Sequence, residues 1–154
     1  MKKLSFLLIS VLLILSIAGS AFAAEQSESV RDEIKDVLFA YKDSYNLRDF
    51  AAIKALYTKD AIIMSFPCDY KEDMSLDKFY DSLPRCSSYW IEKAFKLRLF
   101  KITSFESSAK KCTARVLWDY GDTSERGKFT PTFEFVLEGS QWKIAKEVYG
   151  RNPS

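Results

Sequence analysis

The chain has 154 residues, with 23 Lys and Arg, 21 Asp and Glu, and no histidine. This length is typical of one domain, and the small net charge of +2 gives no basic field that would attract nucleic acid. The lack of histidine excludes Ser-His-Asp and Cys-His nucleophile systems and any histidine-ligated metal. Any catalysis would rest on carboxylates, Tyr, Lys or Cys, and we predict neither a metal nor a cofactor.

Residues 1–23 have the organisation of a secretory signal peptide. A basic start precedes an apolar run over residues 4–18, and residues 21–23 (Ala-Phe-Ala) place small side chains where a signal peptidase reads them. Cleavage after residue 23 would leave residues 24–154 as one exported domain with equal numbers of basic and acidic residues. We therefore expect a bacterial periplasmic or secreted protein without a stable membrane anchor. An uncleaved anchor is the alternative, but the apolar run is short for a membrane span.

The three cysteines are Cys68, Cys86 and Cys112. Because an exported chain meets an oxidising compartment, a disulfide is plausible there. Cys68 and Cys86 flank one polar segment, so we favour a bridge between them, with Cys112 as the odd thiol. Three unpaired thiols, with Cys112 as a small buried side chain, are the alternative. No C-x-x-C pair is present, which leaves a redox motif or zinc knuckle unsupported.

The first half of the domain has helical periodicity. The segment from Ser29 to Asp32 fits a capping box that opens a helix, and residues 46–48 end it. One apolar stripe follows the 3.6-residue period of this helix: Val30, Ile34, Val37, Leu38, Tyr41 and Tyr45. We predict a second helix capped by Asp49 and a strand over residues 61–66. A third helix is predicted over residues 74–83, ended by Pro84.

From residue 88 onward the apolar residues alternate with polar ones, which predicts strands. Three alternating sets mark them: Phe95, Leu97 and Leu99; Cys112, Ala114, Val116, Trp118 and Tyr120; Phe129, Phe133, Phe135 and Leu137. A tight turn at residues 138–140 leads into a last strand with Trp142, Ile144 and Val148. Helices followed by antiparallel strands predict an α+β domain with helices on one face of a sheet.

The order of these elements resembles the nuclear transport factor 2-like (NTF2-like) superfamily, in particular its SnoaL-like branch. Three loose motifs carry the resemblance and together span nearly all of residues 24–154: the stretch from Asn46 through Asp49-Phe50, Ile53 and Leu56-Tyr57 to Asp60-Ala61; Ala114-Arg-Val-Leu-Trp118; and Phe133-Glu-Phe-Val-Leu137 followed by Gly139 and Trp142-Lys-Ile144. The resemblance implies a cone-shaped, curved antiparallel sheet wrapped around N-terminal helices. It also implies a pocket inside the cone and, often, a homodimer.

Fold alone does not fix function, because the superfamily contains enzymes, carriers and interaction domains. Aligned with ketosteroid isomerase, Tyr41 falls where that enzyme has a helix tyrosine that donates to an oxyanion. The position of its general base falls near Ser65, and that of its second acid near Pro131. Two of the three roles are therefore missing here. The dehydratases of the fold rely on histidine, so we lean towards a protein that is not an enzyme.

The candidate pocket residues are aromatic, with a few polar groups: Tyr41, Tyr45, Ser65, Trp118, Tyr120, Phe133 and Phe135. They could line an apolar pocket, or they could fill the cone as core, which is the commoner role of buried aromatic residues. Our first hypothesis is an exported domain that binds a small apolar or aromatic ligand without catalysis. The alternatives are a protein-interaction or dimerisation domain of the cell envelope, and a lyase or isomerase that uses Tyr41 with an unidentified carboxylate.

Overall fold

The computed structural model describes residues 27–65, 73–92, 96–121 and 126–149. Residues 27–47 are helical, and we call them the long helix. The remaining elements are α2 (Phe50–Ala55), β1 (Tyr57–Met64), β2 (Met74–Ser75), α3 (Leu76–Glu92), β3 (Lys96–Ser107), β4 (Lys111–Gly121), β5 (Arg126–Phe129), β6 (Thr132–Glu138) and β7 (Gln141–Val148). This mixture of helices and one curved sheet confirms the predicted α+β class. None of the helices in these ranges is long and apolar enough to cross a membrane.

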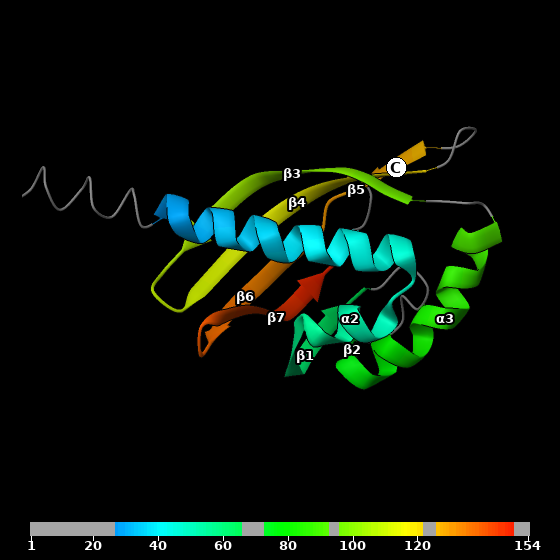
Figure 1. The fold of residues 1–154 in the computed structure, drawn as a ribbon, viewed down its shortest axis with the longest axis horizontal. Helices are drawn as coiled ribbons and strands as arrows, with labels where there is room; N and C mark the ends of the chain where they lie inside the picture. The colour runs from blue at the N-terminus through cyan, green and yellow to red at the C-terminus, as the bar shows by residue number, and fades with distance from the viewer. Residues whose placement is uncertain (1–26, 66–72, 93–95, 122–125, 150–154) are drawn as a thin grey trace, which may run out of the picture.

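The long helix lies across one face of the sheet (Figure 1). Its predicted stripe is confirmed at Ile34, Leu38, Tyr41 and Tyr45, which are all buried. The predicted start is wrong, because the helix already includes residue 27 and Ser29 is therefore not its cap. No Gly or Pro interrupts the polar residues at this end, so they continue the helix with their side chains exposed.

The long helix ends where predicted, in the two nested backbone hydrogen bonds of a Schellman motif. The amide of Arg48 donates to the carbonyl of Tyr45 at 3.2 Å, and the amide of Asp49 donates to that of Ser44 at 2.9 Å. Arg48 has a φ of 60°, the left-handed conformation that this type of helix end requires. The Asp49 side chain then accepts from the amide of Ala52, which caps α2 as predicted.

Asn46 ties the end of the long helix to the edge strand β3. Its side-chain nitrogen donates to the carbonyl of Leu97 at 2.8 Å, and its side-chain oxygen accepts from the amide of Leu97 at 2.9 Å. We expect Asn46→Ala to lower the free energy of unfolding by about 1–3 kcal/mol, because both backbone groups lose their partner. Urea unfolding measures this, with Leu47→Ala as the control, since Leu47 is 78% exposed. Equal losses in the two variants would contradict it.

The described strands form one sheet in the order β2-β1-β7-β6-β4-β3, and β5 pairs with β4 off this path. All pairs are antiparallel except one: β1 runs parallel to β7. The predicted curved, antiparallel sheet is therefore confirmed in every described pair except this one. β1 is the first long strand of the described chain, and β7, the last strand, lies directly beside it in the sheet. The two strands run in the same direction. β7 thereby becomes an interior strand, with neighbours on both sides.

A β-bulge in β7 changes which of its residues point inward. Phe135 pairs with Ile144, but the next pair along is Glu134 with Lys146, so Ala145 is an extra residue on β7. Beyond the bulge, Glu147 and Tyr149 are buried. Val148, which we expected on the same face as Trp142 and Ile144, is only half-buried and pairs with Thr132. The bulge therefore places an acidic residue inside the sheet.

Helix α3 does not end at Pro84 as predicted but continues through it to Glu92. Its buried stripe extends past the proline, with Phe79 and Leu83 before it and Cys86 after it. Packing of this stripe outweighs the loss of one backbone hydrogen bond at Pro84. The first two residues of the predicted helix instead form β2, which pairs with Ile62 and Ile63 of β1.

Cys86 is buried and disulfide-bonded. Cys112 is a free, buried thiol, and burial raises its pKa to about 12. Cys68 lies outside the described residues, as do residues 1–26 with the predicted signal peptide. The Cys68–Cys86 pairing and the cleavage site therefore stay predictions.

Candidate functional site

Glu147 is the only fully buried acidic side chain in the described part of the chain, with an exposed fraction of 0%. It lies on the inner side of β7, opposite Phe133 of β6 and Ile63 of β1. Neither Lys nor Arg forms an ion pair with it among the described residues. Burying a carboxyl group costs free energy unless hydrogen bonds or a counter-charge offset the loss of water.

Three tyrosine hydroxyls surround this carboxyl group, and we call the four side chains together the acid–tyrosine cluster. Tyr57 donates a short hydrogen bond to Glu147 Oε2. Tyr41 donates to Glu147 Oε1 at 3.5 Å, and its hydroxyl also lies 3.2 Å from that of Tyr149. All three tyrosines are buried, with exposed fractions of 3–8%. The cluster is thus a connected network at the centre of an otherwise apolar core.

Each tyrosine of the cluster comes from a different element. Tyr41 belongs to the buried stripe of the long helix, Tyr57 is the first residue of β1, and Tyr149 follows the end of β7. The amide of Tyr149 donates to the carbonyl of Met64 at 3.0 Å, which continues the β1–β7 pairing by one residue. Helix packing and the parallel strand pair together therefore fix the position of the hydroxyls around Glu147.

The cluster has strongly shifted acidities. Burial raises the pKa of Glu147 to about 7, although hydrogen bonds from Tyr57, Tyr149 and Tyr41 oppose the increase. Burial, and then the charge of Glu147, raise the pKa of each of these tyrosines well above its ordinary value. Near neutral pH the tyrosines therefore stay protonated while Glu147 can gain or lose a proton. Such an arrangement can accept a proton, donate one, or bind a polar group.

Aromatic rings form the wall beside the cluster. The ring of Tyr41 lies 5.8 Å from that of Trp118 and 5.9 Å from that of Phe133, and the ring of Tyr149 stacks on Phe129 at 5.9 Å. Trp118 and Phe133 are fully buried, at 0% exposure. These rings give the interior the apolar and aromatic surface that small-molecule sites usually have. They also pack closely against one another.

The structure brings most of the predicted pocket residues to this interior. Tyr41, Trp118, Phe133 and Phe135 point into the core, and Tyr45, at 8% exposure, stacks beside Tyr41. Tyr120 and Ser65 are half-buried and lie further out. The Tyr120 ring covers Gly127 so closely that any Cβ there would collide with it. That these seven residues line a ligand pocket remains a prediction.

Glu147, the chemically most distinctive residue of the interior, was missed by the reasoning from sequence. Simple alternation from Trp142 and Ile144 places Glu147 on the outer face, and only the bulge reverses this. The sequence nevertheless contained a signal: Tyr149 lies two residues after Glu147, so in an extended strand both side chains lie on the same face, and an aromatic side chain favours the inner face. The ketosteroid isomerase alignment pointed instead to Ser65, which follows β1 and has a φ of 55°, and to Pro131.

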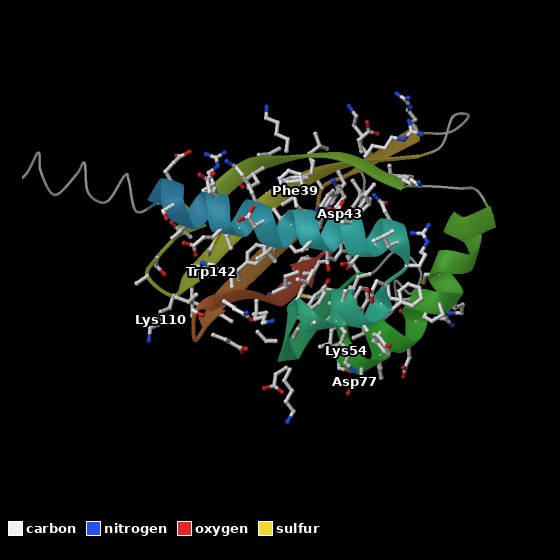
Figure 2. The ribbon with its side chains drawn as sticks, viewed as in Figure 1. Phe39, Asp43, Lys54, Asp77, Lys110 and Trp142 are labelled. Atoms are coloured by element: carbon white, nitrogen blue, oxygen red, sulfur yellow. The ribbon has the colours of Figure 1, made fainter. Side chains whose placement is uncertain are left out.

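The described surface also has a hollow of about 710 Å³ beside the edge formed by β1 and β2. It is open, and its charged residues are of both signs. Lys54 of α2 and Asp77 of α3 form an exposed ion pair there at 2.8 Å (Figure 2). Exposed pairs of this kind contribute little free energy. Within the described ranges, no three Cys, Asp or Glu side chains are placed to hold a metal ion.

Comparison with known proteins identifies the fold. No protein-family model matches the chain, and no curated protein matches it. Among solved structures, it is similar to an NTF2-like protein with a cystatin-like fold from Novosphingobium aromaticivorans, with 11% identity and a TM-score of 0.69 over 86% of this chain and 88% of that one. NTF2-like proteins of unknown function from Pseudomonas putida (17% identity, TM-score 0.65, 80% and 87% covered) and Shewanella oneidensis (15%, 0.62, 79% and 98%) are also similar. The chain therefore has the NTF2-like, cystatin-like fold.

Proposed function

We propose that this protein binds a small apolar or aromatic molecule inside its curved sheet, with the acid–tyrosine cluster contacting a polar group of that molecule. The observation that supports this is the complete burial of Glu147 among three tyrosine hydroxyls, with no Lys or Arg paired to it among the described residues. A chain selected only for stability would favour apolar side chains at such a position, because they avoid the desolvation cost. Shifted acidities in a buried, aromatic setting are typical of functional sites.

Exposure of the interior residues suggests the direction from which a molecule would arrive. Trp118 and Phe133 are fully buried, Tyr45 and Tyr149 reach 8%, and Phe129 is half-buried. Exposure thus increases towards the end of the sheet where β1 and β7 finish. Because the rings are in contact, binding would require Phe129 and Tyr149 to move apart. Such rearrangement of side chains on binding is common.

Native mass spectrometry tests the proposal. The complete chain is expressed in an exporting bacterium and purified as the host delivers it. We expect an adduct of a few hundred daltons that is lost on mild activation, and the protein mass should lack residues 1–23, as our proposal of export and cleavage requires. The adduct should disappear in Glu147→Leu, which removes the polar group, and persist in Phe39→Ala, at an exposed ring. Protein from the same host without any adduct would contradict ligand binding.

Proton transfer is a second candidate function, and the adjacency of Glu147 to Tyr41 favours it. A carboxylate with a pKa near 7 is suited to a general base, and a protonated tyrosine can stabilise an oxyanion. An isomerase or lyase would use these two roles. If the bound molecule, released and re-added in deuterated water, gains deuterium with the wild type but not with Glu147→Gln, the protein is an enzyme. Exchange by neither protein would leave a binding protein.

A further inference from the structure

Trp118 carries a buried hydrogen-bond donor without an acceptor. Its side chain is 0% exposed, and its Nε1–H has no partner in the described structure. Trp142 provides the contrast, because its Nε1 donates to Glu33 Oε2 at 2.8 Å. Buried polar groups are almost always hydrogen-bonded, and an unpaired donor costs free energy. The free donor of Trp118 therefore requires an explanation.

The side chains that contact Trp118 are aromatic rings, and none of them provides an oxygen or nitrogen acceptor within hydrogen-bond distance of its Nε1. The ring of Phe100 lies at 5.3 Å, that of Tyr41 at 5.8 Å and that of Phe129 at 6.5 Å. Tyr41 connects this aromatic group to the acid–tyrosine cluster, where its hydroxyl lies 3.5 Å from Glu147. A molecule held against these rings would lie beside the Trp118 indole and close to Glu147. A negatively charged molecule would be repelled by the ionised Glu147 in this medium of low dielectric.

We infer that Trp118 Nε1–H is a specificity-determining donor, and that the bound molecule is a neutral compound whose apolar body carries an acceptor oxygen, such as a carbonyl. This inference rests on the proposed function and names the class of its ligand. The aromatic wall would hold the apolar body, and the oxygen would satisfy Trp118. A pure hydrocarbon would fill the same space but leave the donor unpaired.

Two probes of similar shape separate the contributions. 1-Indanone has a carbonyl oxygen, and indane is the corresponding hydrocarbon. Each is titrated into the ¹⁵N-labelled protein while the indole N–H signals of Trp90, Trp118 and Trp142 are followed by NMR, with Trp118→Phe assigning the Trp118 signal. We expect 1-indanone, but not indane, to move the Trp118 signal downfield. The Trp142 signal should stay in place, because Glu33 already accepts from it.

The affinities give a second measurement. In Trp118→Phe, the ratio of 1-indanone affinity to indane affinity should fall about five- to tenfold relative to the wild type, as expected for the loss of one net hydrogen bond. Because the probe pair also works on the wild type, the test does not depend on the variant folding. Binding of both probes with an unmoved Trp118 signal would overturn this inference and leave the proposed function intact. Failure of both probes to bind would overturn the two together.

Discussion

Replacing Glu147 with glutamine is expected to make the protein more stable than the wild type at pH 8 and to remove that advantage at pH 4.5. Burial raises the pKa of Glu147 from an ordinary value of 4.5 to about 7. Between these values the folded protein keeps a proton that the unfolded chain has released, so the free energy of unfolding falls as pH rises. Above the folded pKa the loss is complete. It amounts to about 3 kcal/mol, since each tenfold change in proton affinity corresponds to about 1.4 kcal/mol.

Glutamine keeps the shape of the side chain and cannot ionise, so it isolates this effect. Urea unfolding of both proteins at several pH values gives the difference directly. Glu134→Gln is the matched control: Glu134 lies on the outer face of β6, its side chain is 49% exposed, and its partner Lys146 is 3.3 Å away. That substitution should change stability by less than about 1 kcal/mol at any pH. Parallel curves for the two variants would show that Glu147 ionises freely, and would contradict the buried site.

Phe133→Ala should produce the largest loss of stability, about 3–5 kcal/mol, because it leaves a cavity in the centre of the core. The Phe133 side chain is fully buried, and its ring contacts those of Tyr41 and Phe135 at 5.9 Å. The cavity would lie beside the acid–tyrosine cluster, so water that enters it should also lower the pKa of Glu147. The pH dependence described above would then weaken in this variant.

Phe39→Ala is the control for this deletion of a ring. Phe39 is 46% exposed at the edge of the long helix that faces β3 (Figure 2), where its ring contacts that of Phe100 at 4.6 Å. Its loss should cost less than that of Phe133, about 1–2 kcal/mol, since nearly half of the ring is already exposed to water in the folded protein. Chemical unfolding of both variants provides the comparison. A similar loss at the two positions would mean that Phe133 is not part of a closely packed interior.

Periodicity in the sequence was sufficient for the parts of the fold that follow one regular pattern. The long helix has its buried stripe at Ile34, Leu38, Tyr41 and Tyr45, as the 3.6-residue period requires. The alternation in β4 likewise places Ala114, Val116 and Trp118 inside. In both segments the position of a residue in the repeating pattern is enough to predict whether its side chain is buried, because no bulge or kink interrupts the pattern there. The same regularity brought most of the predicted pocket residues to one interior.

Features that depend on contacts between distant segments were not accessible in this way. The bulge at Ala145 depends on how β7 pairs with β6, which the sequence of β7 alone does not determine. Without the bulge, regular alternation predicts an exposed side chain for Glu147. The helix through Pro84 depends on the packing of α3 beyond the proline. The parallel pairing of β1 with β7 depends on the path of the whole chain. The interior site combines two of these three features, which explains why its acidic residue was missed while its aromatic residues were found.

The parallel pair also constrains how the protein reaches its native state. Ile63 of β1 pairs with Glu147 of β7, so the sheet cannot be completed until two segments that are far apart in the sequence have met. Closing so long a loop carries an entropic cost before any contact compensates for it, and such topologies fold slowly. During synthesis, β1 emerges long before its partner and must wait with one side unpaired. We therefore expect the carboxyl group of Glu147 to become buried only after β7 has paired with β1, late in folding.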